Sequence, residues 1–98
     1  MRKNYFGTGG EFILLNDDDT VTLYRQLFGS RTFAINDISA LFFDEGKRLM
    51  NTIPVRNGQI QIKLVDGEVY FVFYHCEKQE DFKSLYTFLC EKIGQPAE

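Results

Sequence analysis

Polar and apolar residues alternate most strictly in Gln59–Leu64, directly after Asn57-Gly58. Alternation with a period of two is typical of a strand with one buried face. The residues predicted to point inward are Ile60, Ile62 and Leu64. Asp66-Gly67 then leads into Val69–Tyr74, a run rich in aromatic and β-branched residues. A short Asp-Gly connection between two such runs predicts a β-hairpin.

The first half of the chain contains four more runs with strand-like composition, separated by clusters of turn-forming residues. These runs are Glu11–Leu15, Thr20–Gln26, Thr32–Ile35 and Ile38–Phe43. The breaks between them are Asn16–Asp19, Gly29-Ser30 and Asn36-Asp37. A weaker strand is expected over Arg48–Ile53, before Pro54, whose ring discourages regular pairing. The pattern therefore predicts about seven strands.

A single amphipathic helix is predicted at the end of the chain, with its start placed at Lys78 to within two residues. Its apolar stripe is Phe82, Leu85, Tyr86, Leu89 and Ile93. Gly94 is placed to cap the C-terminal end, and Pro96 prevents continuation. A helix that follows a series of strands predicts a mainly β fold, a roll or barrel of antiparallel strands whose open end the helix closes.

Length and composition narrow the possibilities further. With 98 residues, of which 44% are apolar, we expect one domain over residues 1–98, with its core at about 7–93. Acidic residues outnumber Lys and Arg by 14 to 11, which argues against nucleic-acid binding. Nothing in the sequence marks secretion or a membrane span, so a soluble, cytoplasmic protein with Cys76 and Cys90 reduced is predicted.

No set of residues adds up to a catalytic, metal or cofactor site, so we expect neither enzymatic activity nor a cofactor. Asn16–Asp19 is rich in carboxylates but lacks the ligand spacing of a calcium loop, and it is interpreted as a solvated turn. His75 is the only histidine, and Glu77 beside it does not define an acid–base pair. A small enzyme would require a buried polar pocket around these two residues.

Apolar side chains on both faces of two predicted strands are the anomaly of this sequence. In Val69–Tyr74 and in Ile38–Phe43 neither face is polar. One explanation is cover from within the chain, by Tyr5-Phe6 or by residues 48–56. The other is an exposed aromatic patch that binds a protein partner or a second copy of the chain. The residues predicted for that patch are Tyr70, Val72, Tyr74, Leu41, Phe43 and Phe88.

The order of these segments resembles the bacterial pleckstrin-homology-like (PH-like) domains over about Gly7 to Ile93. The segments that carry the likeness are Thr8–Leu15, Asp19–Arg25, Ile35–Leu41, Asn57–Ile62, Phe71–Phe73 and Gln79–Phe82. The resemblance implies a bent β-roll of seven strands with the helix plugging one end. It also implies that Gly58, Ile60, Phe73 and Phe82 are framework positions without chemistry.

The leading hypothesis for function is a non-enzymatic protein–protein interaction or assembly module on this PH-like scaffold. An alternative is a membrane-surface adaptor that binds anionic lipid weakly. Its candidate residues are Arg2, Lys3, Arg25 and Arg31. Phosphoinositide-binding relatives place Lys and Arg in the first hairpin loop, which is predicted here to carry Asp17, Asp18 and Asp19. Their negative charge disfavours lipid headgroups.

Overall fold

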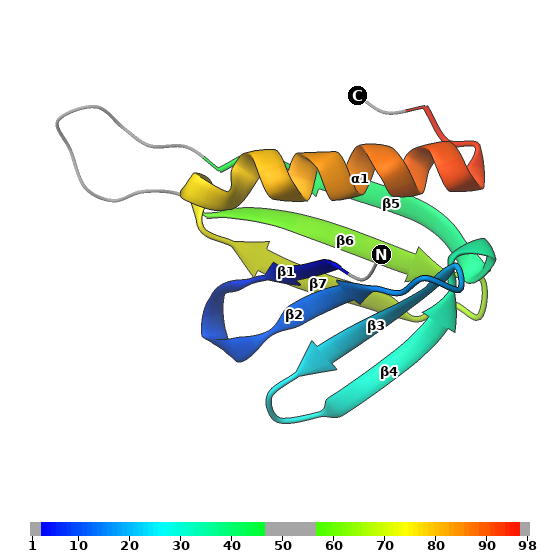
Figure 1. The fold of residues 1–98 in the computed structure, drawn as a ribbon, viewed down its shortest axis with the longest axis horizontal. Helices are drawn as coiled ribbons and strands as arrows, with labels where there is room; N and C mark the ends of the chain where they lie inside the picture. The colour runs from blue at the N-terminus through cyan, green and yellow to red at the C-terminus, as the bar shows by residue number, and fades with distance from the viewer. Residues whose placement is uncertain (1–2, 47–56, 97–98) are drawn as a thin grey trace, which may run out of the picture.

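The computed structural model describes residues 3–46 and 57–96 and contains two antiparallel sheets and one long helix (Figure 1). The first sheet has the order β1-β2-β3-β4 and the second the order β5-β6-β7. The strands are β1 (Lys3–Phe6), β2 (Phe12–Leu15), β3 (Thr20–Arg25), β4 (Gly29–Ala34), β5 (Ile38–Asp44), β6 (Gly58–Leu64) and β7 (Val69–Tyr74). The helix α1 spans Gln79–Ile93. Seven strands and a C-terminal helix confirm the predicted mainly β class.

Within residues 3–46 and 57–96 the two sheets are not closed into a barrel, so of the two forms predicted, roll or barrel, the barrel does not apply. A short 3₁₀ turn at Ile35–Asp37 separates β4 from β5 and ends the first sheet. On the other side, the edge of β7 meets the chain after β1 without strand pairing. The contact there is close, because a Cβ on Gly7 would lie 2.8 Å from a methyl carbon of Val72.

The core lies between the sheets and under the helix. Ile60, Ile62 and Leu64 point into it as predicted. Four residues of the helix stripe are fully buried as well, and Ile93 packs partly against them. The buried members are Phe82, Leu85, Tyr86 and Leu89. Gly94 adopts the left-handed conformation expected of a C-terminal cap, and its N–H donates to the Cys90 carbonyl.

Strand β1 is absent from the sequence-based prediction and changes the order of the loops. It pairs with β2 in the register Tyr5 to Ile13, and Tyr5 packs against Phe82 with ring centroids 6.0 Å apart. Asn16–Asp19 therefore forms the second turn of the sheet, not the first. The turn expected at Gly29-Ser30 lies three residues earlier, at 26–28. The strand expected over Arg48–Ile53 lies outside the described residues.

The free edge of β5 is closed by the segment that follows the helix. The Gln95 side chain accepts from the Leu41 N–H (3.0 Å) and donates through Nε2 to the Leu41 carbonyl (2.8 Å). A single amide thereby replaces a neighbouring strand at this position, which blunts an edge otherwise open to pairing.

Replacing Gln95 by alanine should lower the free energy of unfolding by about 1–2 kcal/mol, because two part-buried backbone groups lose their partners. Urea unfolding of the purified chain measures this. Gln95→Glu retains an acceptor for the Leu41 N–H but cannot donate to the Leu41 carbonyl. Its free energy of unfolding should therefore lie between those of the wild type and Gln95→Ala. An unchanged midpoint for Gln95→Ala would show that the contact is energetically neutral.

Candidate functional site

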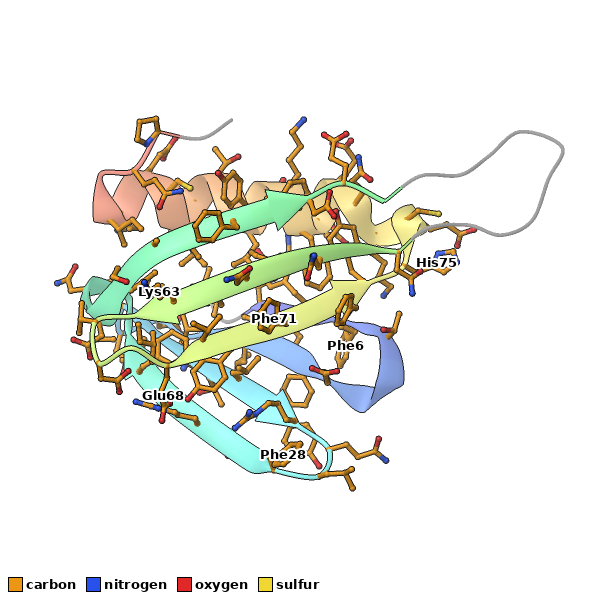
Figure 2. The ribbon with its side chains drawn as sticks, turned by 180° about the vertical axis from the view of Figure 1, so that it is seen from behind. Phe6, Phe28, Lys63, Glu68, Phe71 and His75 are labelled. Atoms are coloured by element: carbon orange, nitrogen blue, oxygen red, sulfur yellow. The ribbon has the colours of Figure 1, made fainter. Side chains whose placement is uncertain are left out.

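The outer face of the β5-β6-β7 sheet carries a row of large apolar side chains in water. We define this outer sheet face by the residues that point away from the core: Phe42 on β5, Gln59, Gln61 and Lys63 on β6, and Val69, Phe71 and Phe73 on β7. Phe42 is 56% exposed, Phe71 46% and Phe73 44%. Figure 2 looks onto this face, where Lys63 and Phe71 are labelled.

Strand register places these side chains next to one another. Gln61 lies opposite Phe42 on one side and opposite Phe71 on the other. Gln59 lies opposite Phe73 in the next row, and Lys63 lies opposite Val69 at the far end. Residues directly opposite in an antiparallel pair share a face. The outward-facing polar residues of β6 are thus flanked by aromatic side chains on both sides, and several large exposed apolar side chains on one surface are typical of an interaction surface.

Most residues of the predicted partner-binding patch point into the core and not toward solvent. Tyr70, Val72 and Tyr74 are buried in the core, and Leu41 on β5 is buried as well. Tyr74 shows why, because its ring stacks on Phe82 with centroids 4.6 Å apart. These four residues are covered from within the chain, but Tyr74 is covered by Phe82 of the helix, whereas Phe6, one of the residues expected to provide cover, is itself 52% exposed.

The other two residues of the predicted patch are less deeply buried. Phe43 and Phe88 are partly buried and pack against the core. Phe43 stacks between Tyr74 and Tyr86, at centroid distances of 5.7 Å and 5.3 Å. Phe73, implied as a framework position, is instead exposed on the outer sheet face. Cover by residues 48–56 falls outside the described part of the chain.

Of the basic residues of the lipid alternative, Arg31 is paired within the protein, whereas Arg25 forms no ion pair among residues 3–46 and 57–96. Arg31 forms an ion pair with Asp66 (3.0 Å) and another with Glu68. It also donates to the Tyr70 hydroxyl at 2.6 Å. Lys3 lies 5.2 Å from the centroid of the Tyr5 ring. Arg2 lies outside the described residues. The two carboxylates reduce the positive charge that Arg31 offers to an anionic surface.

The acidic turn and the histidine both have structural roles. The Asp19 carbonyl accepts from the Ile35 N–H at 2.9 Å, and its carboxylate lies 3.8 Å from Lys92. His75 Nδ1 accepts from the Glu77 N–H at 3.3 Å, which caps the short turn before α1. Across residues 3–46 and 57–96, no group of three or more His, Cys, Asp or Glu side chains is placed to hold a metal ion.

Both cysteines are free thiols in the structure. Burial raises the pKa of the Cys90 thiol, and a hydrogen bond with Tyr86 opposes this in part. A raised pKa disfavours the thiolate, which is the reactive form of cysteine. Cys90 therefore behaves as a small core residue.

Sequence reasoning missed a second exposed apolar feature, the tip of the β3–β4 hairpin. Leu27 and Phe28 are 88% and 73% exposed and form its turn. A cavity of about 210 Å³ adjoins them, and its lining residues are Gly9, Glu11, Arg25, Gln26, Leu27 and Phe28. The signal was present in the sequence, since Gln-Leu-Phe-Gly lacks the Asn, Asp or Pro usual in tight turns before its glycine.

Comparison with protein-family models, with curated proteins and with solved structures yields no match for this chain. No helix in residues 3–46 and 57–96 has the length and the apolar character needed to cross a bilayer.

Proposed function

We propose that the chain is a non-enzymatic, cytoplasmic protein-interaction module on a PH-like scaffold, and that it binds a protein partner across the outer sheet face. The observation that carries this proposal is the exposure of Phe42, Phe71 and Phe73 on one continuous sheet surface. The scaffold part rests on the sequence resemblance, with which two antiparallel sheets followed by one helix are compatible.

Physical chemistry favours binding over a folding role for these phenylalanines. Their neighbours Tyr70, Val72 and Tyr74 already supply the core contacts of β7. Leaving large aromatic rings in water gains nothing for the isolated domain, whereas burying them against a partner removes apolar surface at about 25 cal/mol per Å². Gln59 and Gln61 between them provide amide groups that can hydrogen-bond across an interface.

Substituting Phe71 and Phe73 together by glutamate should abolish partner recovery while the domain stays folded. Aromatic anchors at an interface centre are worth about 1–2 kcal/mol or more each, so we expect at least a tenfold loss. The measurement is affinity capture of the tagged chain from its native cells at physiological salt, with mass spectrometry of the eluate and circular dichroism of each bait.

A matched control adds the same charge away from the outer sheet face. Val65→Glu with Ser84→Glu changes one exposed turn residue and one exposed helix residue, and it should capture the partner as the wild type does. Equal recovery of a stoichiometric partner by Phe71→Glu/Phe73→Glu would move the binding site elsewhere. Loss of partner capture in both double variants would point to a general effect of added negative charge.

A further inference from the structure

The tip of the β3–β4 hairpin combines an exposed apolar projection with an adjacent hollow. We call the six residues lining the cavity of about 210 Å³ the hairpin-tip patch. Closure of the turn needs only backbone groups, since the Phe28 N–H donates to the Arg25 carbonyl at 3.1 Å. Turn positions of this type are usually polar or glycine, so closure of the turn does not explain Leu27 and Phe28.

The hollow is large enough for an apolar side chain. Its two walls are the loop after β1, represented by Gly9 and Glu11, and the turn residues themselves. An apolar cavity of about 150 Å³ accommodates a benzene ring, so 210 Å³ is ample for a leucine side chain. A projection and a hollow of matching size therefore lie on the same patch.

The same patch carries one charge of each sign. The Arg25 guanidinium lies 5.1 Å from the Phe28 ring centroid and 4.9 Å from that of Tyr70. Its Nε is buried and has no hydrogen-bond partner. Within residues 3–46 and 57–96, neither Arg25 nor Glu11 forms an ion pair, although both line the cavity.

We infer that a second copy of this chain docks on the hairpin-tip patch with two-fold symmetry. Leu27 of each copy enters the hollow of the other, and Arg25 of each copy faces Glu11 of the other. Under a two-fold axis one patch meets itself, so a projection beside a hollow and a cation beside an anion become mutually complementary. An anionic membrane or ligand would meet the Glu11 carboxylate with repulsion.

The contact is small, so the association is weak and concentration-dependent. Stable protein interfaces bury about 800 Å² on each partner, and a patch of six residues supplies a fraction of that. This inference does not depend on the proposed function, because it concerns another surface and requires only the purified chain. Phe71→Glu/Phe73→Glu should leave self-association unchanged.

Sedimentation of the purified chain over a range of concentrations tests the inference. The wild-type average mass should rise toward twice the monomer value, and Leu27→Asp should remain monomeric at every concentration. Glu11→Arg and Arg25→Glu should each weaken self-association at least tenfold, because like charges then face each other. An equimolar mixture of the two should associate again, since each supplies the charge that the other lacks.

Circular dichroism separates loss of docking from loss of folding. If Arg25→Glu does not fold, because Arg25 packs on Tyr70, Glu11→Arg and Leu27→Asp carry the test alone. A wild-type chain that stays monomeric at all concentrations overturns the inference, as does self-association unaffected by Leu27→Asp. The tip would be assigned to membranes by a different result. The wild-type chain would then not self-associate but would sediment with vesicles of phosphatidylcholine and phosphatidylserine, and Leu27→Asp would not sediment with them.

Discussion

Tyr74→Glu is expected to unfold the domain. The Tyr74 side chain is fully buried, stacks on Phe82 and Phe43, and donates its hydroxyl hydrogen to the Asp44 carbonyl at 3.0 Å. Glutamate at this position would place a carboxylate in the apolar core, at a cost of about 4 kcal/mol or more. Domains of this size are stable by about 5–15 kcal/mol, and at the lower end of that range such a loss leaves the domain largely unfolded.

Phe73→Glu is the matched control for that experiment. Phe73 is adjacent in sequence and lies on the same strand, but it points outward and is 44% exposed. The charge stays in water there, so a change of about 1 kcal/mol or less is expected. Thermal unfolding followed by circular dichroism compares the two variants. Equal losses from both substitutions would mean that β7 does not present the faces described.

Gly58→Ala should be the second most damaging single change. A Cβ at Gly58 would overlap the Cζ and hydroxyl atoms of Tyr74 and would lie 2.7 Å from the Asp44 carbonyl oxygen. Both neighbours are fixed, one by stacking in the core and the other by strand pairing. Overpacking of this kind costs about 3 kcal/mol, although only one methyl group is added.

Coupling to Tyr74 identifies the cause of that cost. In a Tyr74→Leu background the ring is removed, and Gly58→Ala should then cost at least 1 kcal/mol less than in the wild type. Urea unfolding of the four chains of this double-mutant cycle gives the comparison. Additive losses would contradict the overlap with the tyrosine and leave the close approach to the Asp44 carbonyl, or the backbone flexibility of glycine, as the cause.

Much of the fold follows from the sequence because β6 and α1 have one polar face each. Their apolar residues could be assigned to the core without knowledge of their neighbours, and Ile60, Ile62 and the helix stripe except Ile93 are buried as expected. Strand β1 carried no such signal. Lys3–Phe6 is four residues long and half polar, and its pairing with β2 defines it.

The orientation of β7 could not be predicted, because both of its faces are apolar and the turn before it decides between them. A two-residue turn at Asp66-Gly67 would pair Ile62 with Phe71 and bury the phenylalanines. In the structure the turn is one residue longer, since the Leu64 N–H donates to the Glu68 carbonyl, and Ile62 pairs with Tyr70. A shift of one residue exchanges the two faces of a strand.

That exchange explains why the residues of β7 predicted to be exposed and the residues observed to be exposed lie on opposite faces of the strand. The inference that β7 carries more apolar surface than the core requires was sound, but the residues in water are Val69, Phe71 and Phe73. The hairpin-tip patch was missed for a different reason. Gly29-Ser30 has the composition of a turn, so the sequence alone extends the strand to Gln26 and places the turn three residues too late.

Hydroxyl-radical footprinting of the free chain and of its captured complex tests the central claim most directly. In the free chain, Phe42, Phe71 and Phe73 should be oxidised readily while Tyr70 and Tyr74 are protected. On complex formation the three phenylalanines should become protected, with Val65 unchanged as the internal reference. Unaltered oxidation of Phe71 and Phe73 in the complex would contradict the outer sheet face as the binding surface.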